Sequence, residues 1–148
     1  MGEKKMTARR YLGQLQDIDE MIRQDLERLE EMKHDLVSIG STDYGRERVQ
    51  SSPAGDRLCS DVARVISMND AINAEIDRFV DAREQIIREI RGLHSAIYNS
   101  VLYKVYVQFK IIRQAADEMK ISYRYAVQIH NQALKAFGET YQNLHYLT

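Results

Sequence analysis

Four polar side chains near the C-terminal end of the chain have the spacing of a single helix face. Arg124, Gln128, Asn131 and Lys135 follow one another in steps of four, three and four residues, and such steps place side chains in one line along an α-helix. Arg donates a bidentate pair of hydrogen bonds to guanine, Gln and Asn pair in the same way with adenine, and Lys neutralises phosphate. The spacing therefore indicates hydrogen bonding to double-stranded DNA, and the alternative is an ordinary solvated helix face.

The neighbours of this line extend the candidate site. Tyr123 is a further candidate for contact with base edges. Side chains that contact phosphate position a protein on the duplex without reading its sequence, and Lys120 and Tyr125, together with Lys135, are the candidates for that role. The predicted DNA-binding residues are Lys120, Tyr123, Arg124, Tyr125, Gln128, Asn131 and Lys135.

Two short helices joined by a tight turn would hold these side chains. Ser122 stands at the N-cap position of the second helix, where its hydroxyl can accept a hydrogen bond from an unpaired backbone N–H. Lys120 takes a turn position where Gly or Asn is common, and we expect a positive φ there at a cost of ~1 kcal/mol. This is the outline of a helix-turn-helix, whose second helix enters the major groove. The predicted inward-facing residues are Ile112, Ala115, Ala116, Met119, Ala126, Ile129, Ala133 and Phe137.

Two long helical arms precede this region. Each arm carries residues in alternating steps of four and three, most of them apolar, which is typical of a coiled coil. Similar arm lengths around one connecting segment predict an antiparallel helical hairpin, on which further copies could pack. The first seam consists of Tyr11, Leu15, Ile18, Ile22, Asp25, Leu29, Met32, Leu36 and Ile39, and the second of Leu58, Val62, Val65, Asn69, Ile72, Ile76, Phe79, Arg83, Ile86, Ile90, Leu93 and Ile97.

Three polar residues interrupt these seams: Asp25 in the first arm and Asn69 and Arg83 in the second. A buried polar residue in a coiled-coil seam specifies the alignment of the helices at some cost in stability. This interpretation is favoured over a buried polar site for a ligand, because isolated polar residues in seams are a common device for specificity.

Residues 40–56, GSTDYGRERVQSSPAGD, connect the two arms. Gly, Ser and Asp around the only Pro of the chain predict a loop, and loops of this length tend to be either functional or disordered. Arg46, Arg48, Gln50 and the two adjacent serines are candidates for gripping phosphate. The alternative is a hairpin tip with no binding role.

Composition narrows the class of protein. The chain has 148 residues, one Pro and 29% charged residues, which favours a mostly helical protein of one domain or a small domain with an arm. Residues 94–148 hold six basic and three acidic residues, a net charge of +3, whereas residues 1–40 and 41–93 each carry −2. The basic part thus coincides with the predicted DNA-binding helices.

The same composition argues against several other classes. Cys59 is the only cysteine, which excludes an intramolecular disulfide and fits a reducing cytoplasm. No apolar run approaches the ~20 residues that a membrane helix needs, and the start of the sequence lacks the apolar region of a signal peptide. No phosphate-cradling glycine loop, metal-ligand spacing or nucleophile motif is present. We therefore expect no catalytic residue, no cofactor and no metal.

The sequence also resembles a known family. A helix that ends in Leu102, Tyr103, Tyr106 and Val107 precedes the predicted helix-turn-helix, as in region 4 of sigma factors. The central run RVQSSPAGD and the segments SYRY and ALKAF, with His130 between them, are similar to the sigma region 4-like proteins of phages and integrative elements, which carry a coiled-coil N-terminal half. The resemblance spans most of the chain and implies transcriptional control of phage late genes in the cytoplasm of a bacterial host.

The chain departs from the family pattern at several positions. Phe109 stands where Gly is usual, Ile111 where a Ser or Thr cap is usual, and Gln132 where an Arg is usual. Loss of an Arg removes one expected phosphate contact. These departures leave the expected fold unchanged and bear on the strength of DNA binding.

The sequence therefore predicts an all-α protein: a coiled-coil helical hairpin over residues 1–93 and a helix-turn-helix domain over residues 94–148. The expected function is sequence-specific DNA binding by a transcriptional regulator of a phage or mobile element, acting as a homo-oligomer and without a membrane. One alternative is a sigma-like adaptor that binds RNA polymerase or another protein through the coiled coil. Another is the DNA-recognition subunit of a phage terminase.

Overall fold

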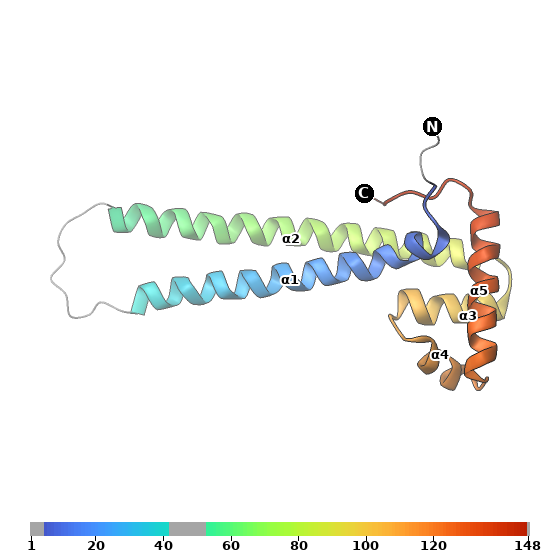
Figure 1. Cartoon of the computed structure of the whole chain (residues 1–148). Helices are drawn as coiled ribbons and strands as arrows, with labels where there is room; N and C mark the ends of the chain where they lie inside the picture. Colours follow the sequence, from blue (N-terminus) through green and yellow to red (C-terminus); the bar gives the residue numbers. More distant parts are fainter. Residues whose placement is uncertain (1–4, 42–52, 148) are drawn as a thin grey trace. The chain divides into compact units, whose positions relative to one another are not determined.

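The computed structural model describes residues 5–41 and 53–147, which form helices joined by short connections (Figure 1). Two long helices, α1 (Ala8–Ser41) and α2 (Pro53–Arg91), form an antiparallel hairpin. A group of shorter elements follows: α3 (Ala96–Leu102), the π-helical segment η1 (Tyr103–Val107), α4 (Ile112–Met119) and α5 (Tyr123–Thr140). No strand occurs in the described ranges. The predicted all-α fold, a long hairpin followed by short helices, is confirmed, and the supercoiling of the hairpin stays a prediction.

The connection between the long helices is shorter than the loop predicted over residues 40–56. Helix α1 continues to Ser41, and α2 begins at Pro53. Pro is well suited to the first position of a helix, because an N–H there would have no partner within the helix. Asp56 in the first turn complements the helix dipole. The phosphate contacts predicted for Arg46, Arg48 and their neighbours lie outside the described residues.

The chain divides into two compact units. The terminal unit comprises residues 1–19 and 78–148, and the hairpin unit comprises residues 20–77. The first turns of α1 and the last turns of α2 thus belong to the same unit as α3, α4 and α5. The predicted domain boundary between residues 93 and 94 falls inside the terminal unit.

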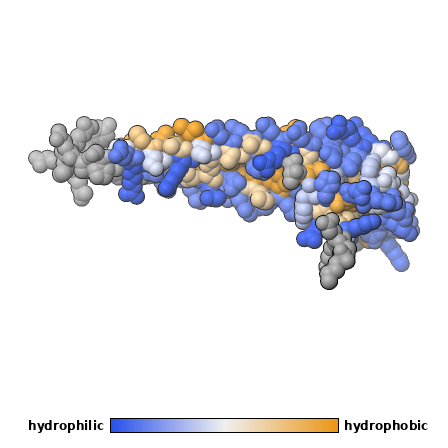
Figure 2. Space-filling view, turned by 90° about the horizontal axis from the view of Figure 1, so that it is seen from above, coloured by the Kyte–Doolittle hydropathy of each residue, from blue (hydrophilic) through white to orange (hydrophobic). Residues whose placement is uncertain are grey.

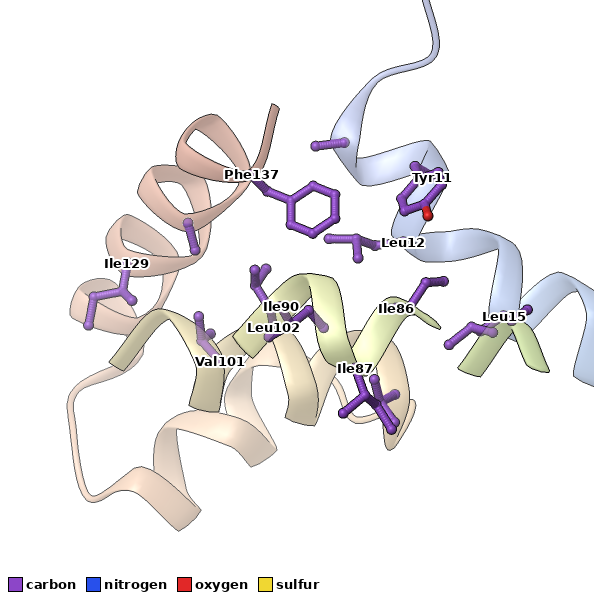
Figure 3. Close-up of a cluster of buried hydrophobic side chains, with 14 residues drawn as sticks. Tyr11, Leu12, Leu15, Ile86, Ile87, Ile90, Val101, Leu102, Ile129 and Phe137 are labelled. Atoms are coloured by element: carbon purple, nitrogen blue, oxygen red, sulfur yellow. The ribbon is translucent and has the colours of Figure 1, made fainter. Parts of the chain in front are cut away.

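Figure 3 shows the hydrophobic core of the terminal unit, to which helices far apart in the sequence contribute. Phe137 of α5 is fully buried beside Tyr11 of α1, with ring centroids 5.8 Å apart. Tyr141, which follows α5, lies with its ring centroid 4.8 Å from that of Phe137. Tilted aromatic pairs at such distances attract each other beyond the effect of burial alone. The other large, fully buried side chains are Leu12, Leu15, Ile86, Ile90, Val101, Leu102 and Ile129.

Hydrogen bonds join three segments around this core. The hydroxyl of Tyr11 donates to Oε1 of Glu89 at 2.5 Å, and the hydroxyl of Tyr141 donates to the Glu89 carbonyl oxygen at 2.8 Å. Burial, helped by the hydrogen bond to Glu89, raises the pKa of Tyr11. The amide of buried Gln14 donates to the Tyr11 carbonyl oxygen and accepts from the N–H of Leu147, at 2.7 and 2.8 Å. The side-chain polar groups of Tyr11, Gln14 and Tyr141 are therefore paired, as is usual for buried polar groups.

In the hairpin unit, the inner face of α1 follows the predicted seam. Ile22 and Leu29 are buried, and Asp25, Met32 and Leu36 are half-buried. The steps of three and four between them are those of one helix face. The seam of α1 is thus confirmed over these residues.

The inner face of α2 differs from the predicted seam. Ile72 is buried and Val65 is half-buried, as predicted. The half-buried positions that alternate with them are Asp61, Met68 and Glu75, each one residue before the predicted position. The prediction is therefore wrong at four of the six seam positions in this unit. The exposed members of the predicted seam in this unit are Leu58, Val62, Asn69 and Ile76.

The physical reason is that α2 has apolar residues on two adjacent sides. Periodicity shows that a helix has an apolar face, but it does not show which side a neighbouring helix covers when two sides qualify. Asn69 is exposed, so it neither sets the alignment as a buried residue nor forms a buried site. Asp25 and Arg83 are half-buried, and each forms an ion pair with a neighbour on its own helix. Oδ1 of Asp25 lies 3.5 Å from a guanidinium nitrogen of Arg28, and a guanidinium nitrogen of Arg83 lies 3.8 Å from Oε1 of Glu84.

The core of the terminal unit generates a first prediction. Phe137→Ala should lower the free energy of unfolding by about 3–5 kcal/mol, because the substitution leaves a cavity beside Tyr11. Urea unfolding followed by circular dichroism measures the change. The control is Tyr146→Ala, which removes an aromatic ring that is 57% exposed and should cost less than about 0.5 kcal/mol. Equal stability of the two variants would contradict the assigned core.

Candidate nucleic-acid interface

A tight turn joins α4 to α5. Lys120 has φ 57° and ψ 43°, in the left-handed region, and the N–H of Ile121 reaches back to the carbonyl oxygen of Ala116 at 3.0 Å. This bond closes α4. Helix α5 begins after Ser122, whose hydroxyl oxygen accepts from the N–H of Tyr125 at 3.1 Å. The predicted turn, the positive φ of Lys120 and the Ser122 cap are confirmed.

The inward faces of the two helices are those predicted. The small side chains of Ala115 and Ala116 are completely covered, which allows α4 and α5 to approach closely. Ile112 and Met119 are half-buried. The buried residues of α5 include all four that the spacing predicts: Ala126, Ile129, Ala133 and Phe137.

The outer line of α5, defined as Arg124, Gln128, Asn131 and Lys135, is fully on the surface. At about 100° per residue these four side chains fall within a sector of about 60°, on the side of the helix opposite Ala133. The line is about 16 Å long at 1.5 Å per residue, comparable to the ~12 Å width of the DNA major groove. It presents donors from a guanidinium, two amides and an ammonium, with amide oxygens as acceptors.

Two tyrosines flank the start of this line. Tyr123 and Tyr125 are 49% and 46% exposed, and Lys120 is exposed at the turn. The guanidinium carbon of Arg113, on α4, lies 4.7 Å from the centroid of the Tyr123 ring, an attractive cation–π geometry. Arg113 is an additional candidate that the sequence did not indicate. Its proximity comes from the packing of α4 on α5, which spacing within one helix does not reveal.

Part of the basic charge of this region is neutralised locally. Glu118 on α4 lies 2.6 Å from Lys110 and 3.5 Å from Lys104, and its hydrogen bond with Lys110 lowers the pKa of Glu118. Two of the six basic residues of 94–148 therefore face a carboxylate. The positive charges at and near the outer line come from Arg113, Lys120, Arg124 and Lys135.

The segment before α4 explains two departures from the family pattern. The π-helical segment η1 ends at Val107, and Phe109 then adopts φ 58°, a conformation that Gly adopts without cost. Ile111 is the N-cap of α4 and has no polar side chain to cap it, but its own N–H donates to Oε1 of Gln114 at 3.2 Å. The chain thus keeps a left-handed residue and a helix start at these positions with unusual residue types.

Helix α5 carries a buried histidine. His130 is 3% exposed, and its Nε2 lies 2.7 Å from the hydroxyl oxygen of Tyr106 on η1, with the two rings stacked. Burial lowers the pKa of His130. Its Nδ1 is buried without a hydrogen-bond partner among the described residues. His130 thus packs and bonds within the unit, and it is not part of the outer line.

Two other kinds of site are absent from the described ranges, residues 5–41 and 53–147. No group of three or more His, Cys, Asp or Glu side chains there could hold a metal ion. No helix in the same ranges is long and apolar enough to cross a membrane. Within this part of the chain, the outer line of α5 with its flanking residues remains the best-defined candidate site.

Comparison with known proteins adds no relative: no family model, no curated protein and no solved structure matches the chain. The resemblance to sigma region 4 therefore stays a prediction.

The left-handed turn generates a second prediction. Lys120→Gly should raise the free energy of unfolding by about 0.5–1 kcal/mol, because Gly adopts a positive φ without the clash of a Cβ atom. The matched control is Lys135→Gly, which removes the same charge but places Gly inside α5, at a cost of about 1 kcal/mol. Both changes are measured by urea unfolding. A Lys120→Gly variant that is destabilised would refute the strain assigned to the turn.

The buried histidine generates a third prediction, for pH dependence. The pKa of His130 in the native state lies below its ordinary value of 6.5, so the unfolded chain takes up the proton first as the pH falls. The native state should lose stability from about pH 6.5 down to the native pKa and then lose no more through this group. His130→Gln should remove this part of the pH dependence. Unfolding series at closely spaced pH values test it, and identical slopes in both proteins would contradict it.

Proposed function

We propose that the chain is a sequence-specific DNA-binding transcriptional regulator of a phage or mobile element, with α5 as the helix that reads the major groove. In this proposal α4 and α5 act as a helix-turn-helix, and Arg124, Gln128 and Asn131 contact base edges. Tyr123 adds a further base contact. The link to phages and mobile elements rests on the resemblance described above.

The observation that carries the proposal is the contrast between the two sides of α5. One side is buried against the core of the terminal unit, and the other exposes the four side chains of the outer line. A recognition helix must present a rigid row of donors and acceptors, because bidentate contacts with bases require fixed geometry. The Ser122 cap and the buried Phe137 hold this helix at its two ends.

Phosphate contacts would come from the edges of the same surface. Lys120 and Tyr125 are exposed at the start of α5, and Lys135 lies near its end. The guanidinium of Arg113 is close enough to the Tyr123 ring to hold that ring in place for a contact with the duplex. A few cations of this kind give a modest electrostatic attraction that falls with salt.

An adaptor role is the second candidate, and one observation favours it. Glu118 neutralises part of the charge of Lys104 and Lys110, so these two lysines attract phosphate less than unpaired lysines would. A protein that binds RNA polymerase or another sigma factor would need little affinity of its own for DNA. The DNA-recognition subunit of a phage terminase would share the same helix-turn-helix chemistry and differ in its partner.

The experiment is selection of duplexes from a random pool with the full chain, followed by gel-shift titration on the selected duplex and on a scrambled one. Arg124→Ala should weaken binding to the selected duplex by about 1–3 kcal/mol and to the scrambled duplex by less. Lys135→Ala should weaken both equally and reduce the slope of affinity against salt by about one.

The matched control is Arg28→Ala on α1, which removes an exposed guanidinium of the hairpin unit and should leave both affinities unchanged. Equal losses on the two duplexes for Arg124→Ala would refute base reading by that residue. If the pool yields no enriched sequence, the titration is repeated with RNA polymerase added. Binding that appears only then would favour the adaptor.

A further inference from the structure

The hairpin unit has little core of its own. Among its described residues, the buried apolar side chains are Ile22, Leu29 and Ile72. Isolated helices are marginally stable in water, and in proteins most of their stability comes from packing of an apolar face. Three buried side chains are few for two helices that each run many turns through this unit.

The same unit exposes a second apolar face. Figure 2 shows that hydrophobic side chains reach the surface of the long helices. Four large apolar side chains of α2 in this unit are 37–57% exposed. Measured from Ile72 at about 100° per residue, they lie about 40–120° ahead of the buried face. The outer face of α2 is defined by the residues in this sector: Leu58, Val62, Ile66, Asn69, Asn73 and Ile76.

The outer face of α2 carries no charged residue, although 29% of the chain is charged. Its steps of four, four, three, four and three are those of a seam that packs against another helix. Asn69 and Asn73 are its only polar members, and uncharged Asn is the polar residue that coiled-coil seams tolerate to fix alignment. A solvated helix face would instead carry charged side chains.

Helix α1 contributes to the same side of the hairpin. Leu26 and Val37 are 41% and 70% exposed and lie about 60–80° ahead of Leu29 on the helix. Here 'ahead' means rotated about the helix axis in the direction in which the chain winds from its N- to its C-terminus. When two right-handed helices pack antiparallel, side chains that lie ahead of the contact line on either helix face the same side of the pair. The charged neighbours Glu30 and Lys33, 3.8 Å apart, give this α1 edge the character of a polar rim.

The size of this surface fits a pair of hairpins. From Leu58 to Ile76 the face is about 27 Å long at 1.5 Å per residue, and two helices side by side are about 20 Å wide. Each copy would thus offer roughly 540 Å², so a pair would cover roughly 1,100 Å², just above the ~1,000 Å² expected of a specific interface.

We propose that the outer face of α2, with Leu26 and Val37 of α1, is an interface with a second copy of this chain. Two hairpins then form a four-helix bundle in which each copy presents the same surface to the other about a two-fold axis. A helix with its own uncharged seam of the same steps would fit this face, and the chain itself supplies one. This inference does not depend on DNA binding, and it would place two α5 helices in one assembly.

The test is sedimentation equilibrium of the full chain over a concentration series. We expect a monomer–dimer equilibrium, and Ile66→Glu should raise the dimer dissociation constant at least ~100-fold, because each carboxylate would lose water at both symmetry-related positions. Ile66 is 57% exposed, so the monomer tolerates the change, and circular dichroism checks its helix content.

The matched control is Met21→Glu. Met21 is 61% exposed but lies about 80° behind Leu29, on the other side of the contact line, so the dissociation constant should change less than ~3-fold. A wild-type chain that stays monomeric overturns the proposal. An equal effect of Met21→Glu and Ile66→Glu, or no effect of Ile66→Glu, overturns this choice of face.

A second measurement gives the distance between two copies directly. Cys59 is the only cysteine in the chain and is exposed at the start of α2, so a spin label there reports only on distances between copies. In the proposed bundle two labels lie within about the ~27 Å length of the face, whether the helices run parallel or antiparallel. Dipolar coupling that disappears in Ile66→Glu supports the interface, and a dimer without coupling overturns it.

Discussion

The packing of Phe137 against Tyr11 is the contact on which the rest of the terminal unit depends. Phe137 lies on the inner side of α5, so the depth to which it is buried fixes the rotation of that helix about its axis. The outer line is placed by the same rotation, because side chains on opposite sides of one helix cannot move independently. Tyr11 is in turn held by Glu89 of α2, whose carbonyl oxygen also accepts from Tyr141. One aromatic contact and one acidic residue thus couple the candidate recognition surface to the bases of both long helices.

Local patterns were sufficient to predict the elements around the candidate site. Ser122, the alanines of α4 and the apolar steps of α5 predict a cap, a close helix contact and a buried face, and each depends on residues near one another in sequence. Arg113 beside Tyr123 and His130 beside Tyr106 depend on contacts between elements, and the spacing of one helix does not encode them. The prediction of which side of α2 faces α1 was wrong for a related reason. Two apolar sides satisfy the same periodicity, and only the position of α1 shows that Ile72 faces inward while Val62 and Ile76 do not.

The two units are stabilised in different ways. The terminal unit holds a dense aromatic and aliphatic core, whereas the described part of the hairpin unit buries few side chains and exposes an uncharged face. Exposed apolar area of this kind lowers solubility and raises the tendency to associate. Natural selection against unspecific association would favour charges at such positions, as on the remaining surface of both helices. Their absence from one continuous sector is therefore more informative than the hydrophobicity of any single residue within it.

The hydrogen bond between Gln14 and Leu147 joins residues 133 positions apart, and its neighbour, the contact of Tyr11 with Phe137, spans almost the same separation. Most helical proteins fold rapidly because their contacts are local. Here the individual helices can form early, but the core closes only when segments from opposite ends of the sequence meet, after a large loss of chain entropy. During synthesis on a ribosome, the first turns of α1 could not pack against α5 until α5 had emerged. The outer line of α5 would then reach its final orientation in the last step of folding, together with the closure of the chain.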